Sequence, residues 1–278
     1  MKTICYYHDD MDGIAAATIV KMNIPDVELK KINYNDEIDI FSYSGKNLII
    51  VDFSFPENLM KGFINLQKTN LVGTLTWIDH HKTAMEKMPD LWNDKNIKGI
   101  RSIEKSGCEL TFEYFNTNNN QTPEAIKLIG DYDMWNFKYG DKTIWFGEYA
   151  NMIIKEPSIE LFSNEFYLKA MENGKILIQK RDEQIKKSFE NGLDIIFCGY
   201  KTRMINTDKN ISNLGEYCYK EKGYQIALIW SMKGKKIICG LRSNTVDVGE
   251  IAKLYGGGGH KFASGFIATL EFMNELFD

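Results

Sequence analysis

The sequence predicts an α/β protein with two domains joined by a helical connector. Its 278 residues exceed one minimal domain and fall short of three, so two domains are the natural expectation. The first half alternates short apolar runs with helical patterns, which is typical of a parallel sheet with helices on both faces. A charged helical stretch then precedes a second set of short apolar runs. We therefore expect domains at residues 1–165 and 192–278, with a connector at 166–191.

The first domain is expected to rest on buried strands. Leu48–Val51 and Leu75–Ile78 are continuous apolar runs, as expected for strands that are covered on both faces. Thr3–Tyr7 and Val27–Ile32 predict two further strands. Helical patterns fall between or after these runs, at Gly13–Met22, from Pro56, at Ser106–Phe115 and at Pro123–Ile129.

The second half predicts a connector followed by a smaller α/β domain. The connector is helical and dense in charge, with Gly174 as a candidate break and Gly192 suited to end it. Short strand-like runs follow at Ile195–Cys198, Ile226–Trp230 and Ile237–Leu241, and the chain becomes glycine-rich at 256–259.

Composition narrows the function classes. The net charge of −4 gives no strongly basic surface for long duplex DNA, which favours a small nucleotide or a short oligonucleotide. No apolar run reaches about 18 residues, so no membrane association is expected. The five cysteines are scattered and form no C-x-x-C pair, which fits reduced thiols. The first residues lack the apolar core of a signal peptide, and we expect a cytoplasmic protein.

The first histidine cluster follows the first predicted strand. The segment runs His8-Asp9-Asp10-Met11-Asp12 and leads into a helix. Successive side chains on an extended segment alternate in direction, so His8, Asp10 and Asp12 would point the same way. One imidazole and two carboxylates form a set of metal ligands. The structural alternative is that Asp12 caps the helix and the other charges are solvated.

Other acidic and imidazole groups follow further elements. Asp52 ends one buried run, and the triplet Asp79-His80-His81 directly follows another. In a parallel sheet such positions share the carboxyl edge, where ligand sites form. Asp131 and Asp133 come after the last helical pattern of this half, where they are equally suited to cap the next turn. Pooled carboxylates repel one another, and divalent cations relieve that repulsion, so we expect two metals at one site.

The order of these clusters resembles the DHH phosphoesterase family, which is named for the motif that stands here as Asp79-His80-His81. The segment from His8 to Gly13 is similar to the first motif of the family, Asp52 to the second and Asp131 to the fourth. In the second half, Leu241-Arg242-Ser243 and the segment from Gly256 to Phe266 resemble the DHHA1 substrate-binding domain. The nano-RNase (oligoribonuclease)-like subgroup is the most similar, including versions with an Asp-x-Asp-x-Trp fourth motif.

The resemblance implies a role for each residue. One metal would be held by His8, Asp10 and Asp52, and the other by Asp12, Asp52, His80 and Asp131. Asp79 would orient a neighbour, and His81 would contact the scissile phosphate or the leaving group. The expected cations are two Mn²⁺, which suit mixed carboxylate and imidazole ligands, with Mg²⁺ or Co²⁺ as alternatives. Substrate phosphate would be bound in the second domain by Arg242, Gly257, Gly258, Gly259 and His260, through a guanidinium fork and close backbone N–H groups.

The expected function is a manganese-dependent phosphoesterase acting on short oligonucleotides or small nucleotides. Four alternatives remain open at this point. They are a RecJ-like single-strand exonuclease, a cyclic-dinucleotide phosphodiesterase, an inorganic pyrophosphatase or polyphosphatase, and a nucleotide-binding protein without activity. The resemblance leaves the oligomeric state open, with a homodimer as one alternative.

Overall fold

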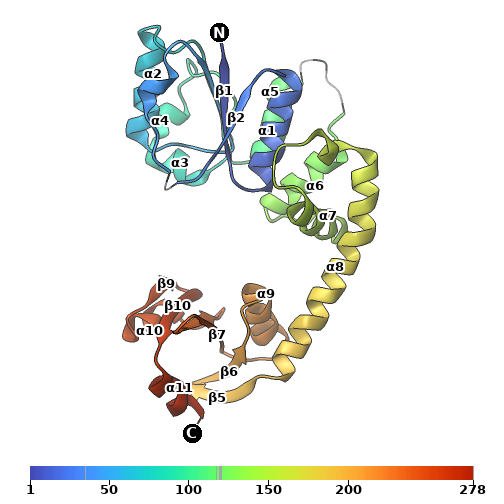
Figure 1. Ribbon diagram of the computed structural model, residues 1–278, viewed down its shortest axis with the longest axis vertical. Helices are drawn as coiled ribbons and strands as arrows, with labels where there is room; N and C mark the ends of the chain where they lie inside the picture. The colour runs from blue at the N-terminus through green and yellow to red at the C-terminus, as the bar shows by residue number, and fades with distance from the viewer. Residues whose placement is uncertain (35, 117, 119–120, 278) are drawn as a thin grey trace. The chain divides into compact units, whose positions relative to one another are not determined.

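The computed structural model describes residues 1–34, 36–116, 118 and 121–277. They form two compact units, Met1–Ile178 and Gln179–Asp278. The expected architecture, a parallel-sheet α/β domain followed by a smaller α/β domain, is confirmed (Figure 1). Among the described residues no helix has the length and the apolar character needed to cross a membrane.

Unit 1 is built on four parallel strands in the order β2-β1-β3-β4. Their bounds are β1 Thr3–His8, β2 Glu28–Ile32, β3 Asn47–Val51 and β4 Leu75–Ile78. Among the described residues, seven α-helices precede α8. They are α1 Met11–Asn23, α2 Glu57–Lys68, α3 Lys82–Lys87, α4 Pro89–Trp92, α5 Gly107–Phe115, α6 Glu124–Asp133 and α7 Asp141–Ile153.

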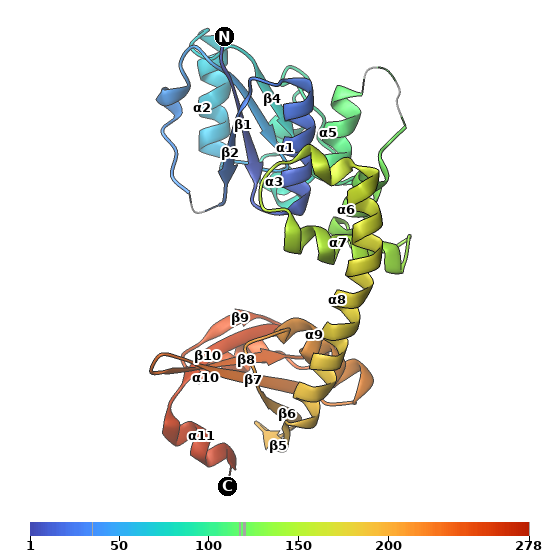
Figure 2. The same ribbon diagram turned by 45° about the vertical axis from the view of Figure 1, so that its right-hand side comes forward.

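Both faces of this sheet are covered because each inner strand is apolar on both sides. In β1, Cys5 and Tyr7 join the core beneath α1, α5 and α6, whereas Ile4 and Tyr6 join the core beneath α2. The alternation follows from the strand period of two. Figure 2 shows α2 on one side of the sheet and α1 with α5 on the other. The continuous apolar sequences of the inner strands therefore reflect burial of both faces of the sheet.

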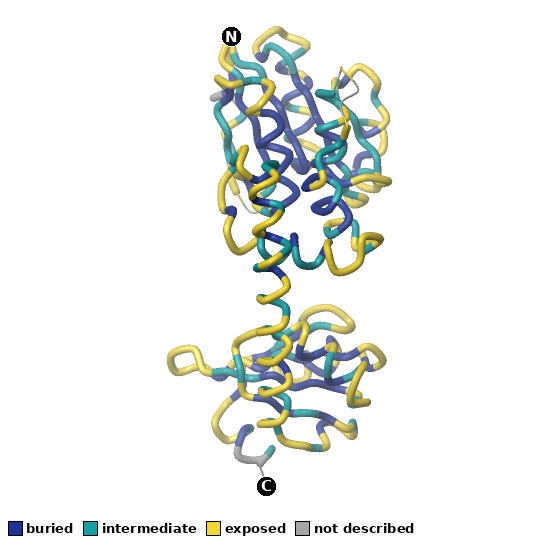
Figure 3. The backbone as a smooth tube through the Cα atoms, turned by 90° about the vertical axis from the view of Figure 1, so that its right-hand side faces the viewer, coloured by how far each residue is buried: buried dark blue, intermediate teal, exposed yellow. Residues whose placement is uncertain are grey.

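Helix α8 runs without a break from Asn164 to Glu190, and the boundary between the units falls within it. The expected break at Gly174 is wrong. A Cβ atom at this position would lie 2.1 Å from the carbonyl oxygen of Trp145 in α7, so the glycine permits close packing inside unit 1. Figure 3 shows the middle of α8 largely exposed, whereas strands β1, β3 and β4 of unit 1 are largely buried.

Unit 2 has a six-stranded sheet in the order β5-β6-β7-β8-β10-β9, antiparallel except for the β6–β7 pair. The strands are β5 Leu193–Phe197, β6 Tyr200–Asn206, β7 Ile226–Lys233, β8 Lys236–Arg242, β9 Gly258–His260 and β10 Ala263–Ala268. The helices are α9 Ile211–Glu216, a π-turn at Tyr217–Glu221, α10 Val248–Leu254 and α11 Leu270–Phe277.

Candidate metal centre

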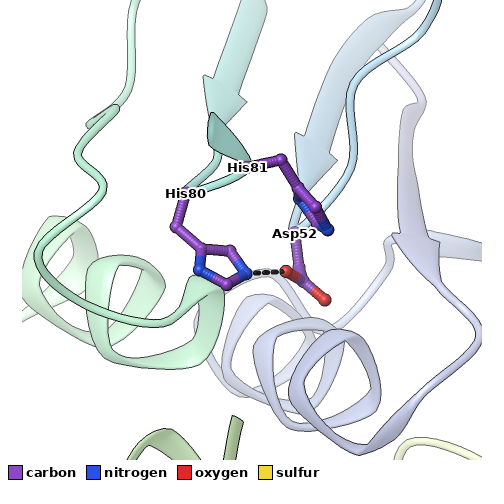
Figure 4. Close-up of side chains that lie close together, drawn as sticks. All are labelled: Asp52, His80 and His81. Carbon is purple, nitrogen blue, oxygen red and sulfur yellow. Dashed lines mark ion pairs between the residues drawn. The ribbon is translucent and has the colours of Figure 1, made fainter. Parts of the chain in front are cut away.

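Three neighbouring strands of the parallel sheet end at the acidic and histidine groups. β1 ends at His8, Asp52 follows β3, and the triplet Asp79-His80-His81 follows β4. Val51 pairs with a residue of β1 and with a residue of β4, so the three strand ends lie in register. The groups therefore meet at the carboxyl edge of the sheet. Figure 4 shows Asp52 and His80 directed toward each other from the ends of β3 and β4, with His81 beside them.

Three sets of side chains have the spacing needed to hold a metal ion, because the ligand atoms within each set lie within 4.8 Å of one another. The sets are His8–Asp10–Asp52, Asp12–His80–Asp133 and Asp52–His80–His81. Asp52 and His80 each belong to two sets. The described residues therefore form one continuous cluster of candidate metal ligands.

His80 connects the acidic residues of this cluster. Its Nε2 atom lies 3.1 Å from Asp52 Oδ1, 3.5 Å from Asp133 Oδ2 and 3.8 Å from Asp12 Oδ2. On the other side of Asp52, His8 Nδ1 is 3.9 Å from Asp52 Oδ2 and 2.6 Å from Asp10 Oδ2. These separations bring imidazole nitrogens and carboxylate oxygens close enough to share a cation.

Asp52 lies at the centre of the cluster and is 1% exposed. Neither of its buried carboxylate oxygens forms a hydrogen bond with a described residue. Its backbone is left-handed, with φ of 52°, which is a costly conformation for a residue other than glycine. A buried carboxylate that accepts no hydrogen bond costs free energy unless positive charge compensates it. The donor set and the absence of hydrogen bonds to Asp52 together fit divalent metal binding.

Helix α5 shapes the same site through its first two residues. Gly107 N–H donates to Asp12 Oδ2 at 2.6 Å, and Cys108 N–H donates to Asp12 Oδ1 at 3.0 Å. A Cβ atom on Gly107 would lie 2.5 Å from Asp52 Cβ, so only glycine leaves room for Asp52 here. Asp12 is thereby fixed in orientation by a helix that begins almost a hundred residues later in the chain.

Crowding of carboxylates shifts their ionisation. Burial, followed by repulsion from Asp12 and Asp10, raises the pKa of Asp52 well above its usual range. Burial and the same two carboxylates raise the pKa of Asp133 to about 8. For Asp10, burial acts to raise the pKa, but contacts with His8 and the Gly13 N–H outweigh it and lower the pKa. The cluster therefore resists holding its full negative charge without cations.

Asp79 does not belong to any of the three sets and instead orients His81. Its buried Oδ1 lies 2.8 Å from His81 Nδ1, and its Oδ2 accepts a hydrogen bond from the Ser54 hydroxyl. Burial disfavours the charged form of His81, but the hydrogen bond and the charge of Asp79 outweigh it and raise the pKa of His81. This arrangement favours an imidazolium at the edge of the metal ligands.

In unit 2, the predicted phosphate-binding residues lie on adjacent strands. Ala263 of β10 pairs with Arg242 of β8 on one side and with His260 of β9 on the other. Directly paired residues share one face of a sheet, so Arg242 and His260 lie on the same face with a small alanine between them. Burial lowers the pKa of Arg242, and its Nη1 donates to the backbone oxygen of Leu241 at 2.9 Å.

The glycine run forms the turn and the edge strand of this sheet. Gly258 and Gly259 belong to β9 and pair with Gly265 and Ser264 of β10. A Cβ atom on Gly257 would lie 2.2 Å from the Gly265 carbonyl oxygen, and Gly259 has φ of 141°. Gly257 and Gly259 are therefore required by the backbone packing, and Gly259 and His260 remain exposed at the sheet edge.

Comparison with protein families decides the identity of the fold. A model described as "DHH family, N-terminal domain" matches residues 2–132, and one described as "DHHA1 domain" matches residues 199–278. The chain belongs to the DHH family. The match confirms the family predicted from the motifs and agrees with the expected class of enzyme, a hydrolase of phosphoester bonds.

Individual relatives of this DHH protein are distant. It is 28% identical to uncharacterized protein R106 of Acanthamoeba polyphaga mimivirus, covering 94% of this chain and 62% of that protein. It is 24% identical to the oligoribonuclease NrnB of Bacillus subtilis, covering 98% of this chain and 74% of NrnB. The chain thus spans less than two thirds of the viral relative. The structure of PggH, a pGpG-specific phosphodiesterase from Vibrio cholerae, has the same fold, with a TM-score of 0.57, 12% identity and coverage of 99% and 95% of the two chains.

The fourth motif of this DHH protein differs in detail from the sequence expectation. Helix α6 extends to Asp133, so both aspartates of the motif lie in its last turn. Residues two positions apart on a helix are separated by about 200°, so they cannot face the same ligand. Asp133 faces His80, whereas Asp131 is not a member of any of the three ligand sets.

Asp131 instead organises the loop before α7. Its buried carboxylate accepts hydrogen bonds from Lys138 N–H at 3.0 Å, from Tyr139 N–H at 3.3 Å and from the Thr143 hydroxyl. This geometry corresponds to the alternative role given for Asp131 above, in which its carboxylate caps the next turn. Asp133 has no metal assigned to it in the sequence prediction, and the length of α6 is the feature that distinguishes the two aspartates.

Proposed function

We propose that this protein is a two-metal phosphoesterase that hydrolyses phosphodiester bonds of short oligonucleotides. The observation that carries the proposal is the position of Asp52, whose two oxygens accept no hydrogen bond from a described residue and lie near different histidines. A carboxylate in this position would be suited to be shared by two cations. That role accounts for a buried aspartate with a left-handed backbone at the carboxyl edge of a parallel sheet.

We assign His8 and Asp10 to one cation, and Asp12, His80 and Asp133 to the other, with Asp52 shared. Mn²⁺ is the proposed ion because this set mixes carboxylate oxygens with imidazole nitrogens. Bound divalent metal lowers the pKa of water and offsets the charge that builds on phosphate oxygens during hydrolysis.

The protein supplies orientation and a proton at this site. Asp79 fixes the ring of His81 and stabilises its charged form, so His81 is placed to donate a hydrogen bond to the scissile phosphate or the leaving oxygen. In unit 2, Arg242 and His260 share one face and are proposed to bind a second phosphate of the substrate.

The substrate class rests on chemistry and on the names of the relatives. An oligoribonuclease and a pGpG phosphodiesterase share the fold, and both names refer to short nucleotide chains. The net charge of −4 leaves little basic surface for a long strand. Dinucleotides and trinucleotides are therefore the proposed substrates.

Substrate length provides the decisive experiment. We expect kcat/KM with Mn²⁺ to fall steeply from two or three nucleotides to strands beyond about ten nucleotides, with a shallow dependence on salt because few phosphates are neutralised. The measurement uses 5′-phosphorylated RNA of two to twenty nucleotides at two ionic strengths. Efficiency that rises with length and collapses in salt would instead indicate a RecJ-like strand exonuclease.

The same panel includes pyrophosphate, polyphosphate and a cyclic dinucleotide as competing substrates. A cyclic dinucleotide or pyrophosphate that is turned over faster than every linear dinucleotide would overturn the proposed substrate class. If the protein bound nucleotides but hydrolysed none of them in the presence of Mn²⁺, it would be a nucleotide-binding protein without activity.

A further inference from the structure

We propose that Tyr34 and the pocket beside it bind a nucleobase that flanks the scissile phosphate. This inference rests on the proposed function. Tyr34 lies two residues beyond β2, whose last residue, Ile32, pairs with His8. It therefore stands at the same carboxyl edge of the sheet as the metal ligands, although it is neither acidic nor a histidine.

The Tyr34 ring is held against the site and remains open to solvent. Its ring centroid lies 4.8 Å from that of Phe53, which is 1% exposed. The centroids of the His8 and His81 rings are 5.5 Å and 6.3 Å away, in edge-on arrangements. Tyr34 itself is 53% exposed. A large aromatic ring fixed on one side and accessible on the other is a stacking platform, and every nucleobase offers a flat face to such a ring.

A pocket of about 410 Å³ opens beside Tyr34, close to the lower limit of small-ligand sites. Its buried floor is apolar apart from Ser54 and includes Phe55, Ala84 and Met88. Exposed polar groups, among them Thr83 and Lys87, lie at the rim. An apolar floor with a polar rim matches a flat heterocycle that carries hydrogen-bonding groups along its edges.

The pocket is continuous with the catalytic residues. Ser54 lines the pocket and donates its hydroxyl hydrogen bond to Asp79, the residue that orients His81. A nucleotide whose phosphate contacts His81 would therefore have its base within reach of Tyr34. A phosphate alone, or pyrophosphate, would leave the pocket empty, so the pocket is suited to distinguish nucleotides from inorganic substrates.

Two substitutions at one position separate stacking from structural support. Tyr34→Leu removes the ring, and Tyr34→Phe keeps it as the matched control. On a linear dinucleotide we expect Tyr34→Leu to reduce kcat/KM by about five- to one-hundred-fold, mainly through KM, because stacking contributes about 1–3 kcal/mol per base. Tyr34→Phe should stay within about twofold of the wild type.

Two dinucleotide analogues, each lacking one base, locate the contact. On one analogue the wild type and Tyr34→Leu should have equal kcat/KM. On the other analogue, Tyr34→Leu should still have a lower kcat/KM than the wild type. Equal losses on both analogues would show that the ring only supports His8 and His81, and no loss on the intact dinucleotide would also overturn the inference.

Binding of 2-aminopurine riboside 5′-monophosphate decides the point without hydrolysis. Stacking on Tyr34 should quench the fluorescence of the probe with the wild type and with Tyr34→Phe, and the quenching should disappear with Tyr34→Leu. Retained quenching in Tyr34→Leu would reject the base site. A wild type that quenches the probe but hydrolyses no nucleotide would reject the proposed function and leave the base site standing.

Discussion

His80 Nε2 lies 3.1 Å from Asp52 Oδ1, although the two residues end different strands and are separated by 27 intervening residues (Figure 4). The contact exists because β3 and β4 are parallel neighbours in register. It places an imidazole against a carboxylate that has no hydrogen bond from any described residue.

The first prediction concerns the metal and its competition with protons. Chelation followed by dialysis should abolish hydrolysis, and Mn²⁺ should restore it. The pKa values of Asp52 and Asp133 are raised, that of Asp133 to about 8, so cation binding must displace protons at neutral pH. Affinity for Mn²⁺ should therefore increase from pH 6 to pH 8.

Calorimetry in buffers of different ionisation enthalpy measures the protons released. Binding without proton release at pH 7 would contradict the raised pKa values, and hydrolysis that survives complete chelation would contradict the metal-dependent mechanism.

The second prediction concerns the effect of the buried Asp52 carboxylate on the free energy of unfolding. Asp52→Asn should raise the free energy of unfolding of the chelated protein by about 1–3 kcal/mol, because a buried carboxylate that is repelled by neighbouring carboxylates is replaced by a neutral group. Since the folded-state pKa of Asp52 is raised, its destabilising effect is absent below the unfolded pKa and grows as pH rises toward the folded pKa.

Urea unfolding at pH 5 and pH 8 in chelator tests this dependence. The increase in the free energy of unfolding caused by Asp52→Asn should be larger at pH 8 than at pH 5. In the presence of Mn²⁺, the variant should bind less metal and lose nearly all turnover. The bridging role proposed for Asp52 would be contradicted if Asp52→Asn lowered the free energy of unfolding, or if the variant kept two bound metals and wild-type turnover.

The third prediction separates the two aspartates of the fourth motif. Asp133→Asn should reduce metal content, because its carboxylate faces His80. Asp131→Asn should keep its metal and instead lower the free energy of unfolding by about 1.5–3 kcal/mol, because its charged hydrogen bonds hold the loop before α7. Elemental analysis and urea unfolding of both variants measure this contrast, and the reverse pattern would restore Asp131 as the ligand.

The fourth prediction concerns the phosphate contacts in unit 2. Arg242→Ala and His260→Ala should keep the metal content of the wild type and lose about ten- to one-hundred-fold in kcat/KM, the effect of one charge-assisted hydrogen bond. Lys236→Ala, at the opposite end of β8, serves as the matched control and should have little effect. Unchanged kinetics in both variants would exclude the proposed phosphate contacts.

Sequence alone was sufficient for the class of fold and for placing most of the candidate metal ligands at one edge of the sheet. Buried parallel strands are continuous apolar runs, and the residues that directly follow them meet at one edge whatever the details of packing. His8, Asp52 and His80 could therefore be assigned to one site from their positions after strands. The same reasoning reached Asp10 and Asp12, because they lie within four residues of a strand end.

Only the tertiary structure decided which side chains face the cluster from elements that are not strands. The choice between Asp131 and Asp133 depends on the length of α6 and on a rotation of about 100° per residue, which no local pattern specifies. Likewise, Tyr34 lies beside His8 and His81 because β2 is the edge strand next to β1. Neighbour order in a sheet is set by long-range packing, so an aromatic residue in a loop gives no sign in the sequence that it borders the site.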